Sequence, residues 1–247
     1  MRFIRNLSIE VVLGAVLYQL FLFKVYFQSS PPFPEVAILA LVVWFLYLLD
    51  RQVDNLFQPI QDERHQVHAR HRKFYKVFIV LLGFSIVCLL PFQSTQVLLA
   101  GFLLMLLVLG YAFAWHKGRL RLEKELFTAL LYAMGVGLVV WVREPKSIFL
   151  LLPLMALAYQ NLCFFNLIDS SSVFYSARLK KTEWMLLGLL SGIYAATQDL
   201  FIVLPFLVTF GITFLLSRTA LSERRRFWGD LAFWSPLFYL LHGIFST

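Results

Sequence analysis

Charged side chains are scarce in this chain of 247 residues. Asp, Glu, Lys and Arg together make up 15% of it, whereas hydrophobic residues make up 60%. Soluble domains carry roughly a quarter charged residues. Here the few charges cluster between long apolar runs, so they cannot cover a surface that faces water. A soluble globular fold is therefore excluded, and the sequence predicts a protein embedded in a lipid bilayer.

Cysteine is also scarce. The two cysteines, Cys88 and Cys163, each lie inside an apolar run. They lack the paired spacing of a zinc site and are too few for a disulfide framework, so we interpret both as small core residues. Internal repeats and low-complexity stretches are missing as well, and residues 1–247 are predicted to form a single integral-membrane domain.

Long apolar runs, in contrast, occupy most of the chain. A helix needs about 20 apolar residues to cross a bilayer, and the windows that meet or approach this length predict an all-α bundle of nine transmembrane helices. The windows cover residues 7–27, 35–50, 74–92, 96–115, 124–142, 147–168, 183–198, 200–217 and 227–245. The second and seventh are short for a hydrocarbon core of about 30 Å, so their ends are expected to lie in the interface.

The basic residues predict the orientation of the bundle. With the N-terminus in the cytoplasm, the predicted cytoplasmic loops cover residues of about 51–73, 116–124, 169–182 and 218–226. All but three of the 22 Lys and Arg residues then lie on the cytoplasmic side, the exceptions being Lys24, Arg143 and Lys146. This asymmetry follows the positive-inside rule and accounts for the net charge of +8 without nucleic acid as a partner. We therefore expect a multi-pass protein of the cell membrane with a cytoplasmic functional face.

Acidic residues gather at the cytoplasmic ends of two predicted helices. Asp50 and Asp54 end the second, and Asp169 ends the sixth. These helices run in the same direction, so their carboxylates can face one cavity. A carboxylate at a helix C-terminus opposes the macrodipole, which a bound cation would offset. If the second helix continues through Asp54, the two aspartates project from one face and offer Mg²⁺ the oxygen ligands that it prefers.

A plainer interpretation of these acids stays open. Asp50 and Asp54 can equally be solvated anchors that pair with Arg51 or the following basic stretch. Asp169 precedes three serines, a pattern that also indicates the end of a helix and a polar loop. Charged residues are almost missing from the middle of the spans, which weakens ion-coupled transport as a function.

Basic and histidine residues complete the polar side of the bundle. Lys117, Arg119, Arg178 and Lys180 lie on the same side as the acids and suit a diphosphate, although positive-inside placement already explains most of them. The spacing of His65, His68 and His71 permits a metal site, but an oxygenase of the membrane di-iron type needs about twice as many nitrogen ligands. We interpret these histidines as loop residues.

Three segments resemble motifs of the UbiA superfamily of intramembrane prenyltransferases. Residues 50–54, Asp-Arg-Gln-Val-Asp, resemble half of its first aspartate motif, N-D-x-x-D-x-x-x-D. Residues 111–117 resemble its Y-x-x-x-K-R segment, and residues 166–182 fall where its second motif, D-x-x-x-D-x-x-x-G-x-x-T, belongs. The resemblance covers nearly the whole chain and implies the nine-helix fold of that family.

The resemblance also implies an activity. Members of the family bind an isoprenyl diphosphate through Mg²⁺ and aspartates, ionise it, and let the allylic cation attack an aromatic or otherwise electron-rich acceptor. Carried over, this makes Asp50, Asp54 and Asp169 the metal ligands and catalytic residues. It makes the following residues substrate contacts: Arg51, Lys117, Arg119, Asn166, Arg178 and Lys180.

The chain also departs from the family's pattern. Leu46 and Tyr47 stand where the first motif begins with Asn-Asp, and Val173 and Ala177 replace an aspartate and the glycine of the second motif. A catalytically inactive UbiA-like scaffold or accessory subunit is therefore an alternative to an enzyme. A third hypothesis is an uncoupled carrier of a lipid or small molecule.

Overall fold

The computed structural model describes residues 9–57, 72–116, 124–170, 173–219 and 224–245 of the chain. The predicted loop histidines, His65, His68 and His71, lie outside the described residues. So do two of the predicted substrate contacts, Lys117 and Arg119.

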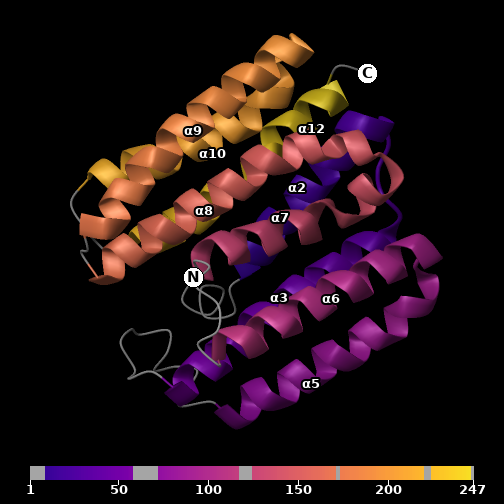
Figure 1. Ribbon diagram of the computed structural model, residues 1–247. Helices are drawn as coiled ribbons and strands as arrows, with labels where there is room; N and C mark the ends of the chain where they lie inside the picture. The colour runs from indigo at the N-terminus through magenta and orange to yellow at the C-terminus, as the bar shows by residue number, and fades with distance from the viewer. Residues whose placement is uncertain (1–8, 58–71, 117–123, 171–172, 220–223, 246–247) are drawn as a thin grey trace.

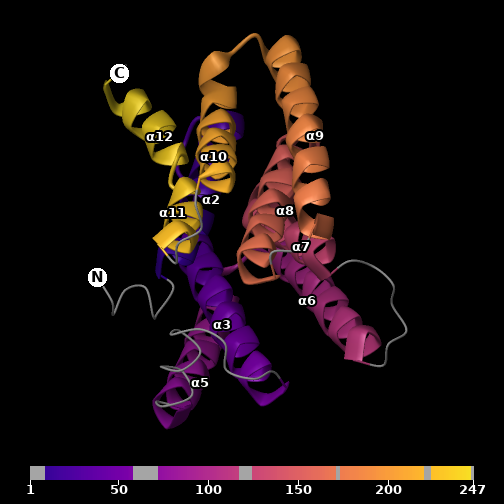
Figure 2. The same ribbon diagram turned by 90° about the vertical axis from the view of Figure 1, so that its left-hand side faces the viewer.

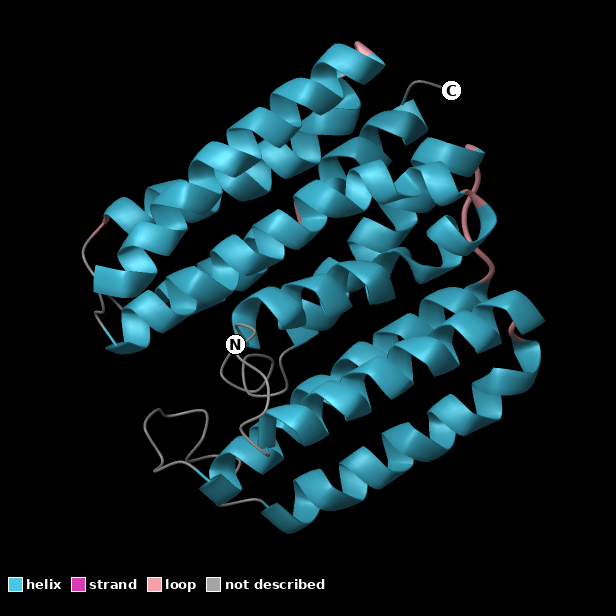
Figure 3. Ribbon diagram, in the orientation of Figure 1, coloured by secondary structure: helices cyan, strands magenta, loops and turns pink. Residues whose placement is uncertain are grey.

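Helices make up all the regular structure of the described part, as Figure 3 shows. The α-helices are α2 (Ile9–Phe27), α3 (Phe33–Phe57), α5 (Arg72–Leu89), α6 (Thr95–His116), α7 (Lys124–Arg143), α8 (Ile148–Ser170), α9 (Val173–Thr197), α10 (Leu200–Arg218), α11 (Arg224–Ala232) and α12 (Pro236–Phe245). Two short 3₁₀ helices, η1 (Leu90–Phe92) and η2 (Pro145–Ser147), follow α5 and precede α8.

Six helices of the described part are long and apolar enough to cross a membrane: α2, α3, α5 with η1, α7, α8 with η2, and α10. A shorter apolar stretch, Thr95–Tyr111, lies in α6. The all-α fold is therefore confirmed, and these helices fit a membrane-embedded bundle. That the chain crosses the membrane nine times stays a prediction.

The helices alternate in direction, so that their ends gather on two sides (Figure 1). We call the side where α3, α6, α8 and α10 end and where α7, α9 and α11 begin the inner end. It corresponds to the predicted cytoplasmic side. The ends of α3 and α8 that carry the predicted acidic residues both lie there, as their common direction requires.

The interior of the bundle is built around α2. This helix packs against α3, α7, α11 and α12, and its residues Tyr18, Phe21 and Leu22 are completely buried. The ring of Phe21 lies 5.6 Å from that of Phe206 and 4.9 Å from that of Tyr239. Closely packed aromatic rings thus join α2 to α10 and α12.

The peripheral helices α5 and α6 expose most of their apolar side chains. Figure 2 shows that α6 and the pair α3 and α5 leave the central helices in different directions, and α6 packs chiefly against α7. Exposed leucine and phenylalanine side chains on such helices suit contact with lipid acyl chains. Cys88 is exposed on α5, so its interpretation as a core residue was wrong, whereas Cys163 is buried as expected.

Two predicted boundaries change. α3 continues through Asp54 to Phe57, which places Asp50 and Asp54 one turn apart on one helix. The predicted loop at residues 169–182 is wrong, because α9 already begins at Val173. Leu179 and Leu186, seven residues apart, are both buried, while Lys180 is exposed. Lys180 and Lys181 therefore lie on the outward face of the first half of α9, whereas Arg178 is half-buried.

The predicted last span, residues 227–245, is not one continuous helix. It divides into α11 and α12 around a turn at residues 233–235. Pro236 lacks the N–H group that a continuing helix requires and restricts the residue before it. The hydroxyl of Ser235 donates to the Pro205 carbonyl oxygen at 2.7 Å, and Thr209 Oγ1 lies 3.0 Å from the Ala232 carbonyl oxygen. Side-chain hydroxyls thus link the turn to α10 where the helix breaks, so that buried polar groups have partners, as a bilayer interior demands.

Thr209 is the centre of this hydrogen-bonded turn, since its hydroxyl also lies 2.8 Å from the hydroxyl of Tyr18. We expect Thr209→Val to lower the free energy of unfolding by about 1–2 kcal/mol, because it leaves buried polar groups without a partner. Thermal unfolding in detergent measures this loss. Thr213→Val, one turn along α10 and equally buried, is the matched control, and an equal loss in both variants would contradict the role assigned to the turn.

Candidate functional site

A polar cluster at the inner end joins three helices through one carboxylate. Glu125, in the first turn of α7, accepts a hydrogen bond from Asn166 Nδ2 of α8 at 2.7 Å. The same oxygen, Oε1, accepts a second from the hydroxyl of Tyr175 on α9 at 3.1 Å. A carboxylate in the first turn is favoured by the helix macrodipole. We call Glu125, Asn166 and Tyr175 the Glu125 cluster.

Aromatic and basic side chains surround this cluster. The ring of Tyr111, near the end of α6, stacks on Phe127 of α7 with the centroids 3.9 Å apart. The guanidinium of Arg178, on α9, lies 3.5 Å from the ring centroid of Phe174, a cation–π arrangement. The structure thus brings two predicted substrate contacts, Asn166 and Arg178, to the inner ends of α8 and α9 beside a carboxylate.

The other predicted site residues are described only in part. Asp50 and Lys180 are both exposed. The backbones of Arg51 and Asp54 belong to α3 and that of Asp169 to α8, while their side chains lie outside the described part. α3 packs chiefly against α2 and α5, and α8 chiefly against α7, α9 and α10.

Magnesium is the cofactor that the sequence predicts. Among the side chains that the structure describes, no three acidic, histidine or cysteine residues come together as a metal site. The donor chemistry nevertheless suits Mg²⁺, since Asp50 and Asp54 lie one helical turn apart and carry carboxylate oxygens. Together with Asp169 they are the residues that would hold it.

An ion pair fixes the inner ends of the next two helices. Arg218 of α10 donates to Glu183 of α9 at 2.7 Å, and the glutamate side chain is 6% exposed. The Arg218 guanidinium also lies 4.8 Å from the ring of Phe214. This ion pair links α9 to α10 in the inner half of the bundle, the half that also contains the Glu125 cluster.

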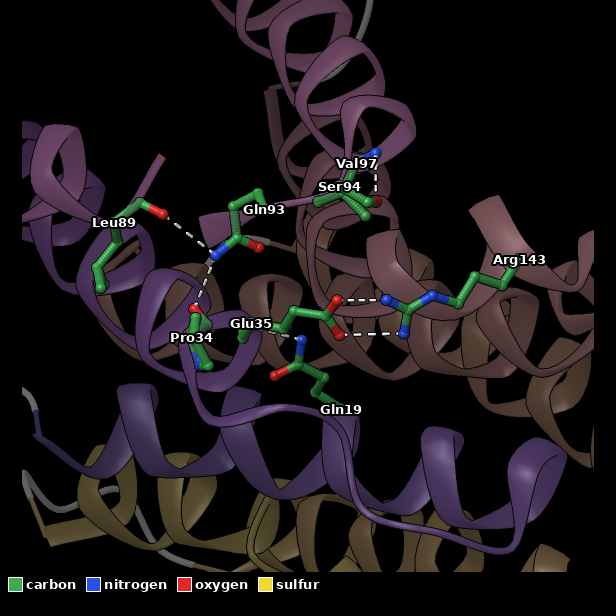
Figure 4. A network of polar contacts seen from close by, with 8 residues as sticks. All are labelled: Gln19, Pro34, Glu35, Leu89, Gln93, Ser94, Val97 and Arg143. Carbon is green, nitrogen blue, oxygen red and sulfur yellow. Dashed lines mark hydrogen bonds and ion pairs between the residues drawn. The ribbon is translucent and has the colours of Figure 1, made fainter. Parts of the chain in front are cut away.

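A second polar network lies at the opposite end (Figure 4). The side chains of Glu35, on α3, and Arg143, at the end of α7, form a two-pronged ion pair, one bond of which measures 3.1 Å. Gln19 of α2 donates to the backbone carbonyl of Glu35 at 3.3 Å, and Gln93, after η1, donates to that of Pro34 at 3.1 Å. The network ties the outer ends of α2, α3, α5 and α7 together.

The sequence gives little signal for these partnerships. Glu35 and Arg143 are 108 residues apart, and Glu125 and Asn166 are 41 apart. The available signal is that Glu35 and Glu125 each lie in the first turn of a helix, where the helix macrodipole favours a negative charge. Their partners come from other helices, which the spacing of residues does not predict.

Comparison of the chain with protein-family models, with curated proteins and with solved structures finds no match. The features of the chain that bear on its function are therefore the geometry of the inner end and the motifs in the sequence.

Proposed function

We propose that the protein is a UbiA-like intramembrane prenyltransferase. It moves an isoprenyl group from an isoprenyl diphosphate to an aromatic or lipid acceptor in the presence of Mg²⁺, at the inner end of the bundle. This end corresponds to the cytoplasmic face of the cell membrane.

One observation carries the proposal. The ends of α3 and α8, which bear Asp50, Asp54 and Asp169, lie on the same side of the bundle (Figure 1). The basic first half of α9, with Arg178 and Lys180, begins on that side too. Carboxylates for a divalent cation and cations for a diphosphate are therefore available at one end of an apolar bundle.

Each group has a role in the proposed reaction. Bound Mg²⁺ would neutralise the diphosphate as it leaves. Arg178 and Lys180, with Arg51, Lys117 and Arg119, would bind the diphosphate oxygens. Asn166, held by Glu125 at 2.7 Å, would orient the substrate from α8. Aromatic faces such as that of Tyr111 would stabilise a transient allylic cation without capturing it.

The test is diphosphate release by the purified full-length protein. Isoprenyl diphosphates of several chain lengths are supplied with a membrane lipid extract as the source of acceptor. We expect release that requires Mg²⁺ and stops when EDTA is added. If no chain length gives Mg²⁺-dependent release, and Mg²⁺ with the diphosphate does not raise the melting temperature, the enzyme proposal is wrong.

A catalytically inactive scaffold is the second candidate. Asp50 is exposed, and Tyr47 and Val173 occupy positions where the family has acids. These features favour a bundle that retains the fold without the chemistry. Such a protein would co-purify with a partner protein and would show no thermal shift on addition of Mg²⁺ and an isoprenyl diphosphate.

A further inference from the structure

A buried arginine at the start of α11 has no hydrogen-bond partner for either terminal nitrogen. Arg225 is 4% exposed, and its Nη1 and Nη2 atoms are shielded from solvent without a bond to the protein. Arginine stays charged at any physiological pH. Burial of guanidinium N–H groups without a hydrogen-bond acceptor is costly, so an occupant of the site that accepts from them is to be expected.

The face of α11 that carries Arg225 lies partly against α8. Gly229 follows Arg225 by four residues, so both lie on one face of α11. A Cβ atom on Gly229 would lie 2.9 Å from Asn161 Oδ1 and 3.0 Å from the ring of Phe165, both on α8. The guanidinium of Arg226 lies 5.6 Å from the ring centroid of the same Phe165. The first turn of α11 therefore places the Arg226 guanidinium beside α8.

The polar groups at this contact suit an anion. Asn161 is 8% exposed, and its Oδ1 has no hydrogen-bond partner. Its amide can offer an acceptor or, after rotation, a donor. Guanidinium groups bind phosphate oxygens through paired N–H groups, and the N-terminus of a helix favours negative charge. Three consecutive arginines, residues 224–226, otherwise oppose the dipole of α11 at its start.

We propose that the site formed by Arg225, Arg226 and Asn161, which we call the α8/α11 arginine site, binds the phosphate group of a lipid. Arg225 and Arg226 lie in the first turn of α11, at the inner end of the bundle, where the head groups of a surrounding bilayer would lie. Asn161 lies farther in, on the part of α8 that Gly229 approaches. A phospholipid head group and an isoprenyl diphosphate share the chemistry that the arginines recognise. The inference does not depend on the proposed prenyl transfer, because it concerns binding without metal at a different pair of helices.

Binding to the full-length protein in detergent with EDTA tests this site. Three probes distinguish the sources of phosphate: phosphatidic acid, farnesyl diphosphate and inorganic pyrophosphate. Diacylglycerol, which has the tails of phosphatidic acid without the phosphate, controls for apolar contact. Native mass spectrometry measures retention, and the shift in melting temperature measures stabilisation. We expect at least one phosphate-bearing lipid to bind and to raise the melting temperature, and diacylglycerol to do neither.

The variant Arg225→Gln is expected to weaken that binding at least about tenfold, the effect of losing charge-assisted hydrogen bonds. Lys76→Gln, which removes one positive charge from an exposed position near the inner end of α5, is the control and should bind like the wild type. If Arg225→Gln does not fold, Arg225→Lys is used instead. It keeps the positive charge but lacks the paired N–H groups of the guanidinium, so it should bind the lipid more weakly than the wild type. Unchanged affinity in the Arg225 variant, or binding of pyrophosphate alone, overturns the proposal.

The outcome is separable from that of the prenyltransferase test. Mg²⁺-dependent product formation can fail while phosphatidic acid still binds through Arg225 in EDTA. Conversely, turnover with no Arg225-dependent binding of any phosphate-bearing lipid would reject the α8/α11 arginine site and leave the proposed reaction intact.

Discussion

Replacing Arg143 by alanine is expected to lower the free energy of unfolding by about 3 kcal/mol, because it leaves the charge of Glu35 buried and unpaired. The Glu35 side chain is 5% exposed and that of Arg143 30%. The arginine also lies 5.5 Å from the ring of Phe23, so the variant loses this cation–π contact as well. Chemical or thermal unfolding of the protein in detergent measures the change.

A second variant separates the ion pair from the packing around it. The double variant with Glu35→Gln and Arg143→Gln removes both charges and leaves an uncharged polar side chain at each position. It should recover much of the stability that Arg143→Ala loses, since no charge is then left buried. Lys146→Ala, an exposed charge three residues along, controls for net charge at this end. A loss of similar size in Lys146→Ala would show that the pair contributes nothing specific.

Asp54→Asn and Asp169→Asn are each expected to lower the rate of Mg²⁺-dependent diphosphate release about 100-fold or more. Each removes a carboxylate that the proposal assigns to the metal, and a loss of about 3 kcal/mol in transition-state stabilisation corresponds to this factor. Asparagine preserves size and hydrogen bonding, so the melting temperature without ligand should stay close to that of the wild type. The rates are measured at saturating Mg²⁺ and isoprenyl diphosphate.

Asp199→Asn is the matched control for this loss. Asp199 caps α10 at the opposite end of the bundle, where its side chain accepts from Phe201 N at 2.8 Å. Asparagine caps helices about as well as aspartate, so activity should be unchanged. If Asp54→Asn and Asp169→Asn keep wild-type rates, the aspartates are solvated anchors and the site assignment is wrong.

The sequence predicts the positions of most helices because apolar length alone defines them in a bilayer. The prediction of helix boundaries fails where contacts between helices determine the local structure. The first half of α9 was predicted as a loop from its charges, yet buried Leu179 and Leu186 hold it against the bundle as a helix. The break near Pro236 was missed because the average hydrophobicity of residues 227–245 is high. The hydroxyl of Thr209, which lies beside the Ala232 carbonyl oxygen of the turn, belongs to another helix and does not enter that average.

In the candidate site, too, some residues could be predicted from the sequence, whereas others depend on contacts between helices. Asn166 and Arg178 are substrate contacts by the resemblance to the UbiA superfamily, and both lie at the inner end, while their role stays a prediction. Glu125 was not predicted, since its importance comes from two partners on other helices. The metal-binding role of Asp50, Asp54 and Asp169 stays a prediction. Arg225 had been counted only as a cytoplasmic charge, and its burial follows from the packing of α11 on its neighbours.

The division of the last apolar run has a consequence for biogenesis. α11 has 9 residues and α12 has 10, and at about 1.5 Å per residue neither reaches across a bilayer unaided. Both short helices therefore depend for their place on packing against α2 and α10, which must be in position first. Before this step the hydroxyl of Thr209 has Tyr18 and the Pro205 carbonyl oxygen as partners, and the turn adds the Ala232 carbonyl oxygen and Ser235, so the C-terminal region completes a network that α2 and α10 begin.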